Sequence, residues 1–342
     1  MRRREFITLV SGTVFASPVA ALAQQPGKSI PGKSYRIAII HPFAPVEDMN
    51  EAARPIGPAY QYFFAELRRL GYVEGQNLVV ERYSGVGKIG HQSELLLSVA
   101  ASKPDAISTV AMESALKAAP VAIPIVEIGL DPIAFGLASS LAHPDRNITG
   151  VAIIAGNELY AKHLELLQEA IPTASRIVCL TSRELWESPS NTFGPLREAA
   201  KQLGVALIPA VLEPPYPDSE YRRVFAAMAQ DRPDGLIVTP AIWNFAHQKL
   251  IIELVEHARL PAIYPTRSYV DQGGLMSYGA DAAEIFRRAA SDIAEILGGA
   301  KPGDIPYYQS SRFEFVINLK TAKALGLTLP QSLFARADEV IE

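Results

Sequence analysis

The first half of the chain alternates short apolar runs with amphipathic segments. Apolar residues recur at helical spacing from Tyr60 to Leu70, and Gly71 follows them as a helix stop. The amphipathic segments predict helices at 60–70, around 95–99, at 113–119 and at 133–141. The apolar runs predict strands at 35–40, 78–81, 106–110, 123–127 and 149–154. This order of elements favours a parallel sheet.

The second half continues the same rhythm. Amphipathic segments predict helices at 159–170, 196–203, 221–229, 248–258 and 283–297, and a short helix through Leu325. Apolar runs predict strands at 177–180, 205–210, 236–239, 262–264, 275–278 and 313–318. The alternation predicts an α/β fold with parallel sheets covered on both faces. One open sheet of about a dozen strands is uncommon, so we expect two sheets in two lobes.

Three segments without periodicity divide the chain, at 144–149, 279–281 and 298–305. They predict an N-terminal lobe of residues 35–147 plus 281–303 and a C-terminal lobe of 148–280 plus 304–342. Three crossings between two lobes would form a hinge. Ligands of open α/β sheets bind beyond the carboxyl ends of the strands, so we expect the site between the lobes.

Composition excludes several classes of protein. The chain has 342 residues, 49% of them apolar, and its 32 basic and 36 acidic residues give a net charge of −4. No basic block lies beyond the N-terminus, so we expect no nucleic-acid partner. The single cysteine, Cys179, excludes an internal disulfide and a site built from several thiolates.

The N-terminus is typical of an export signal. Arg2, Arg3 and Arg4 precede an uncharged stretch that ends in Ala21-Leu22-Ala23. We expect a twin-arginine-like signal at residues 1–23, cleaved near Ala23, and a flexible leader at 24–34. A membrane anchor is the alternative, but this stretch contains Ser, Thr, Gly and Pro and would span poorly. The mature protein is therefore expected in the periplasm.

Small, hydroxyl and aromatic residues follow many of the expected strands. Hydroxyl groups at Thr109, Ser182, Thr239 and Thr266 precede helices, whose first backbone N–H groups can receive a carboxylate or another acceptor. Arg183 and Arg267 are candidate anion clamps, with a solvated surface role as the alternative. Five aromatic side chains could stack on a flat ligand, or pack in the core instead: Phe43, Trp243, Tyr264, Tyr269 and Tyr278.

A few residues could support catalysis. Glu127 and Asp131 flank a strand end, where two carboxyl groups could do acid–base work, although Asp131 before Pro132 also fits a helix cap. His41 follows a strand directly. No cofactor-binding glycine loop, nucleophile elbow or metal-ligand spacing accompanies them in the sequence. We therefore expect a binding protein with no cofactor or metal rather than an enzyme.

Several ordered segments carry a family resemblance. They read LGYVEGQN at 70–77, DPIAFGL at 131–137, NITGV at 147–151, LPAIYP at 260–265, GGLMSYG at 273–279 and FEFVINLKTAK at 313–323. With these segments, the sequence resembles the ABC transporter substrate-binding family often described as tryptophan/tyrosine-type. It differs from the family's glycine-rich loop at 109–114, where Met112 and Glu113 add bulk and charge.

The resemblance implies a type I periplasmic-binding-protein fold: two Rossmann-like parallel-sheet lobes joined by a three-strand hinge. It implies a monomeric solute-binding component of an ABC importer. Such a protein would close on a small aromatic or carboxylate-bearing, amino-acid-like ligand and deliver it to an inner-membrane permease. The loops that follow the strands would form the site. The candidate ligand-binding residues are His41, Phe43, Thr109, Ala111, Met112, Glu113, Ser114, Glu127, Asp131, Ser182, Arg183, Thr239, Trp243, Thr266, Arg267, Tyr278 and Asp281.

Two other functions remain open at the level of sequence. A ligand-sensing receptor domain that partners a membrane kinase would have the same fold, and neighbouring permease or kinase genes would distinguish the two. An exported enzyme using His41, Glu127 or Asp131 would turn over its bound compound, whereas a binding protein releases it unchanged.

Overall fold

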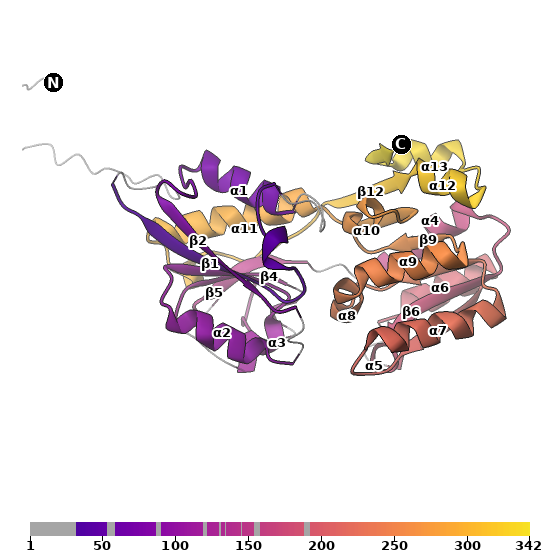
Figure 1. The fold of residues 1–342 in the computed structure, drawn as a ribbon, viewed down its shortest axis with the longest axis horizontal. Helices are drawn as coiled ribbons and strands as arrows, with labels where there is room; N and C mark the ends of the chain where they lie inside the picture. Colours follow the sequence, from indigo (N-terminus) through magenta and orange to yellow (C-terminus); the bar gives the residue numbers. More distant parts are fainter. Residues whose placement is uncertain are drawn as a thin grey trace, which may run out of the picture.

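Two α/β lobes lie side by side in the structure, with chain segments crossing between them (Figure 1). The computed structural model describes residues 32–52, 59–86, 90–118, 122–129, 131–133, 135–144, 146–153, 158–187 and 192–342. The expected export signal and most of the expected leader fall outside these residues. None of the described helices combines the length and the apolar composition needed to cross a bilayer.

The first lobe is built on a sheet whose strands are all parallel. Its order is β11-β5-β4-β3-β1-β2. The strands are β1 (Tyr35–His41), β2 (Leu78–Ser84), β3 (Ala106–Val110), β4 (Ile125–Gly129), β5 (Ile148–Ala152) and β11 (Tyr308–Gln309). Strands β3, β4 and β5 are buried almost throughout, as expected of a parallel sheet covered on both faces.

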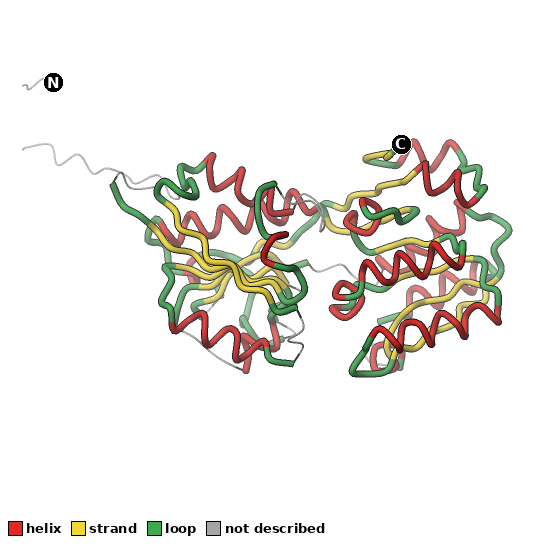
Figure 2. Tube along the Cα trace, in the orientation of Figure 1, coloured by secondary structure: helices red, strands yellow, loops and turns green. Residues whose placement is uncertain are grey.

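Helices cover both faces of this sheet (Figure 2). Apolar side chains of β1 and β4 pack with those of α1 (Ala59–Arg69) and α11 (Ala282–Leu297) on one face. The other face packs against α2 (Gln92–Ala101) and α3 (Glu113–Ala118). Two 3-10 turns, η1 (Val46–Asp48) and η2 (Pro302–Asp304), complete the lobe. The late helix α11 therefore belongs to the first lobe.

The second lobe contains a sheet in the order β13-β12-β10-β9-β8-β6-β7. Its strands are parallel except for the antiparallel pair β10 and β12. They are β6 (Arg176–Ser182), β7 (Ala206–Leu212), β8 (Gly235–Val238), β9 (Ala262–Tyr264), β10 (Met276–Ala280), β12 (Phe313–Asn318) and β13 (Glu339–Ile341). The two parallel-dominated sheets confirm the expected α/β fold.

The helices of the second lobe also form two layers. One layer contains α4 (Glu158–Ala170), α6 (Gly194–Leu203), α12 (Leu319–Leu325) and α13 (Gln331–Arg336). The other contains α7 (Asp218–Asp231), α9 (Gln248–Ala258) and α10 (Arg267–Asp271). Two short helices, α5 (Arg183–Trp186) and α8 (Ile242–Ala246), follow the carboxyl ends of β6 and β8.

The chain passes between the two lobes three times. The crossings lie between β5 and α4, between β10 and α11, and between β11 and β12. The lobe boundaries expected at residues 147 and 303 are therefore too early. Residues Ile148–Ala152 pair with β4, and Tyr308–Gln309 pair with β5, so both strands belong to the first sheet. The non-periodic segments at 144–149 and 298–305 lie inside the first lobe, whereas the segment at 279–281 coincides with the second crossing.

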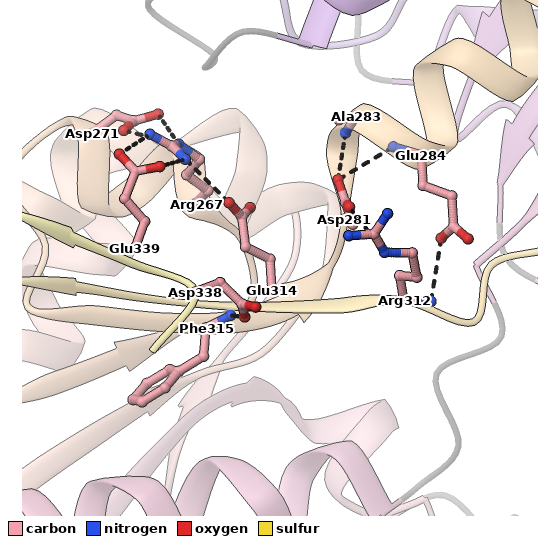
Figure 3. A network of polar contacts seen from close by, with 10 residues as sticks. All are labelled: Arg267, Asp271, Asp281, Ala283, Glu284, Arg312, Glu314, Phe315, Asp338 and Glu339. Carbon is pink, nitrogen blue, oxygen red and sulfur yellow. Dashed lines mark hydrogen bonds and ion pairs between the residues drawn. The ribbon is translucent and has the colours of Figure 1, made fainter. Parts of the chain in front are cut away.

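Polar contacts tie the second and third crossings together (Figure 3). Asp281 caps α11 by accepting from the backbone N–H groups of Ala283, at 2.8 Å, and Glu284, at 3.2 Å. It also pairs with Arg312 at 3.6 Å. The Glu284 carboxylate accepts from the Arg312 backbone N–H at 3.2 Å and from the Tyr308 hydroxyl at 2.6 Å. Two chain segments that connect the lobes are thus linked to each other by side-chain contacts.

The helix expected at 133–141 is wrong. Residues 131–133 and 135–141 form turns, with no helix in the described part of this segment. Backbone bonds from Phe135 to Asp131, at 3.1 Å, and from Leu137 to Pro132, at 2.8 Å, close a single turn. Gly136 then adopts a left-handed φ of 70°, which ends it. The apolar side chains of this segment still reach the core, which explains the helix-like spacing.

Candidate ligand-binding site

Aromatic side chains of the two lobes meet where the strands of both sheets end. Phe43, just after β1, stacks on Phe245 of α8 with ring centroids 5.6 Å apart and planes 9° apart. Figure 1 places α8 on the side of the second lobe that faces the first. We call the residues that follow these strand ends the interlobe face: 41–44, 110–114, 129 and 131 in the first lobe, and 182–187 and 239–246 in the second.

His41 organises the loop after β1. Its Nδ1 accepts from the backbone N–H groups of Ala44, at 3.0 Å, and Phe43, at 3.3 Å, so the ring proton resides on Nε2. Burial lowers the pKa of His41 to about 3. The imidazole and the Phe43 ring are nearly perpendicular, and their centroids are 4.5 Å apart. His41 is therefore a neutral residue that fixes the position of Phe43.

A second cluster joins the ends of β3 and β4. The Thr109 hydroxyl is hydrogen-bonded to Glu127 Oε2, and the Met112 backbone N–H donates to Glu127 Oε1 at 2.7 Å. Ala111 stands between them at a φ of 50°, a left-handed conformation that is costly for alanine. This turn brings the Met112 N–H back over Glu127 and starts α3. Thr109, Met112 and Glu127, predicted as site residues, are thus brought together.

The buried carboxyl group of Glu127 has a neighbour of the same charge. Glu113, the first residue of α3, is 6% exposed, and Glu127 is 2% exposed. Burial and the charge of Glu113 raise the pKa of Glu127 well above its usual range, against the effect of the Met112 hydrogen bond. Both effects favour the neutral, protonated form of Glu127. Ser114 is exposed beside this pair.

The second lobe contributes mostly fixed polar groups. The Thr239 hydroxyl donates to the Leu180 carbonyl at 2.7 Å and is buried. Ser182 caps α5 by accepting from the Leu185 N–H at 3.2 Å. Trp243 stacks on Tyr216 with centroids 4.5 Å apart and planes 14° apart. The aromatic pair offers a flat apolar surface, whereas the two hydroxyl groups shape the loops.

Both candidate anion clamps are engaged by acidic side chains. Arg183 is exposed and pairs with Glu213 at 2.7 Å and Glu187 at 3.3 Å. Arg267 binds Glu339 at 2.6 Å and Glu314 at 3.1 Å (Figure 3). These acids raise the pKa of Arg267, and the network links α10 to β12 and β13. Each guanidinium therefore contributes to the local fold through partners of its own lobe.

The remaining candidates lie close to the connections between the lobes or within turns. Tyr278 stacks on Phe313 at 5.6 Å and lines a cavity of about 790 Å³ with residues of α4 and of the third crossing. Asp281 caps α11, as described above. The Thr266 hydroxyl is bonded to that of Ser268 at 3.0 Å. Asp131 Oδ1 accepts from the Ile133 N–H at 2.9 Å and so stabilises the start of the turn that follows.

The sequence did not indicate three aromatic residues that lie near the site. Phe245 and Tyr216 occupy short non-periodic segments, where an aromatic residue carries no positional signal. Tyr307 lies 180 residues after Glu127 in the chain, yet the charges of Glu127 and Glu113 both raise the pKa of its hydroxyl. The chain leaves the first lobe after β5 and returns before α11, and this return brings Tyr307 beside β5.

Two α/β lobes with converging strand ends define a binding protein of the type I periplasmic-binding-protein fold. The model of a family described as ABC transporter substrate binding protein matches residues 58–341, so the chain belongs to that family. A tyrosine-binding protein from Clostridioides difficile is 24% identical over 268 residues, which cover 78% of this chain and 75% of that protein.

Solved structures confirm the fold. The ABC domain from Streptococcus pneumoniae in complex with L-Trp has a TM-score of 0.73 at 20% identity, covering 90% of this chain and 100% of that one. A conserved domain protein from Vibrio cholerae also scores 0.73, at 23% identity and the same coverage. The ligand-free, open form of a substrate binding protein from Clostridium difficile scores 0.60 at 20% identity, covering 90% and 99% of the two chains.

Proposed function

We propose that the protein is the periplasmic solute-binding component of an ABC importer and binds an aromatic, amino-acid-like ligand between its lobes. The stack of Phe43 on Phe245 carries this proposal, because it joins aromatic groups of opposite lobes at the strand ends. The tyrosine-binding relative and the similar structure with L-Trp support the same class of ligand. The ligand would contact the interlobe face of both lobes.

Closure of the lobes would transmit the bound state to the permease. A ligand that contacts both lobes stabilises the closed form, and a shift from 1% to 99% closed needs about 10⁴-fold tighter binding to that form. The three crossings would allow the lobes to rotate. The contacts between Asp281, Glu284 and Arg312 link the second crossing to the third. The export signal at residues 1–23, cleaved near Ala23, would place the mature protein outside the cytoplasmic membrane.

A thermal-shift screen tests the proposed ligand class. The panel contains L-tryptophan, L-tyrosine, L-phenylalanine, their deaminated acids and amines, and a set of sugars. We expect a concentration-dependent rise in the melting temperature with at least one aromatic compound. Hits confined to sugars, or no aromatic hit, would contradict the proposal.

Phe245→Ala tests the position of that ligand. Loss of an aromatic contact is expected to weaken binding about 10-fold, since such pairs contribute roughly 0.5–1.5 kcal/mol beyond their area. The matched control is Phe334→Ala, which removes a partly buried phenylalanine of α13 that does not belong to the interlobe face. Titration calorimetry measures both variants, and equal affinity in the two would place the ligand elsewhere.

A further inference from the structure

Two carboxyl groups converge at the end of β4 because the strand ends in glycine. A Cβ atom built on Gly129 would lie 2.5 Å from Glu113 Oε1 and 3.0 Å from Glu127 Oε1. The volume that a side chain at this position would need is therefore filled by carboxyl groups from two elements, Glu113 of α3 and Glu127 of β4. Any larger residue at this position would push the pair apart.

Glu127 is held rigidly in this arrangement. Its two oxygens are engaged by the Thr109 hydroxyl and the Met112 N–H, and both bonds are buried. Lys117, a cation on the same helix as Glu113, is exposed and extends toward Gly136, where its Nζ would lie 3.7 Å from an added Cβ. The pair thus places two carboxyl groups close together at one edge of the interlobe face.

Tyr307 gives an independent indication that a ligand group belongs here. Its side chain is 94% buried, since its exposed fraction is 6%, and its hydroxyl has no hydrogen-bond partner among the described residues. Tyr308 pairs with Val151 and Val151 pairs with Ile128, so the preceding residues Tyr307, Gly150 and Glu127 share one row across the sheet. Gly150 has no side chain between the other two, and burial and both acids raise the pKa of the Tyr307 hydroxyl. A buried hydroxyl without a partner is costly, and a ligand group would remove that cost.

The three groups match one kind of ligand atom. A protonated primary amine carries three N–H donors and a positive charge. Glu113 and Tyr307 offer acceptor oxygens, and a cation placed beside Glu127 favours the ionised form of that carboxyl group. All three groups can then accept from the amine in a buried setting, where charge-assisted hydrogen bonds are strong. The aromatic residues of the interlobe face supply the surface for a flat ring, and the two candidate anion clamps are already paired with acids.

We propose that Glu113, Glu127 and Tyr307 bind the protonated amine of the ligand, so that the protein selects aromatic amines and amino acids over deaminated aromatic acids. This rests on the proposed function and names the group that determines specificity. Glu113 provides the charge, while Glu127 and Tyr307 orient the amine. The recognition of a ligand carboxylate would then be secondary to that of its amine.

Titration calorimetry with three probes tests the proposal: L-tryptophan, tryptamine and indole-3-propionate. We expect the wild type to bind the two amines at least about 100-fold more tightly than the deaminated acid. Glu113→Gln should lose about 100-fold in affinity for L-tryptophan and no longer distinguish it from indole-3-propionate. The matched control, Glu94→Gln, removes an exposed acid of α2 in the same lobe and should leave all three affinities unchanged.

Tyr307→Phe provides a second variant if Glu113→Gln does not fold. It removes only the hydroxyl, and we expect about a 5-fold loss for the amines and none for the deaminated acid. Equal affinities of the wild type for all three probes, or unchanged L-tryptophan binding in both variants, would overturn the amine site while leaving the proposed function intact. If the wild type binds none of the probes and no aromatic amino acid, both proposals fail.

Discussion

Gly150→Ala is expected to destabilise the first lobe by about 3 kcal/mol or more. Gly150 has a φ of 145°, and an added Cβ would lie 2.0 Å from the Glu127 carbonyl oxygen and 2.7 Å from its backbone nitrogen. Both atoms belong to β4, which pairs with β5 at this register, so neither can move without breaking the ladder. Backbone strain and overpacking each cost roughly 1–3 kcal/mol. Urea denaturation measures the loss.

Gly299→Ala separates the two causes of this loss. Gly299 has a φ of 104°, but an added Cβ there would meet no atom within 4 Å. This variant should show only the backbone cost, about 1 kcal/mol. Equal destabilisation by the two substitutions would mean that the contact with Glu127 is unimportant, and the close approach of β4 and β5 would not explain the glycine.

Asp292→Asn is expected to stabilise the protein above pH 7 and to have little effect near pH 4. Asp292 lies inside α11 with no exposed side-chain surface. Burial raises its pKa from 3.8 to about 7. Arg288, whose guanidinium lies 2.9 Å from Asp292 Oδ1, opposes the rise, and Glu295 adds to it. The folded state therefore holds a proton that the unfolded state releases near pH 4, so this group's contribution to stability is lost as the pH rises to about 7.

The size of the effect follows from the difference in pKa. One pKa unit is worth about 1.4 kcal/mol, so ionisation of Asp292 in the folded protein costs on the order of 4 kcal/mol at pH 8. Asparagine has a similar shape and no charge. The free energy of unfolding of the variant should therefore exceed that of the wild type by an amount that grows between about pH 4 and pH 7 and levels off above. Arg288→Met removes the paired charge and should destabilise the protein most at pH 8. A pH-independent difference between Asp292→Asn and the wild type would contradict this assignment.

Much of the fold could be predicted from local patterns. Strands β9 and β12 and helix α9 end where the apolar periodicity ends, because Pro or a polar residue bounds each run. Short elements such as α5, α8 and β11 are too brief for a period of 3.6 or 2 to show. The segment around Gly136 imitates a helix because its apolar side chains reach the same core from a turn.

The candidate site was less predictable, because its geometry depends on partners far along the chain. The sequence pointed to Thr109 and Glu127, which neighbouring strands bring together. It also pointed to Arg267, but Glu339, which holds this guanidinium, follows 72 residues later. Tyr307 belongs to the first lobe only because the chain returns there at the second crossing, and no local pattern reports such a return.

The central claim is that the two lobes close on a small ligand, and an inter-lobe distance tests it most directly. The native Cys179 is buried, so spin labels can be attached at Ser98→Cys on α2 and Arg222→Cys on α7, two exposed positions in different lobes (Figure 1). We predict that a saturating ligand from the thermal-shift screen shortens and narrows the distance distribution measured by pulsed electron resonance. A distribution unchanged by saturating ligand would contradict the claim.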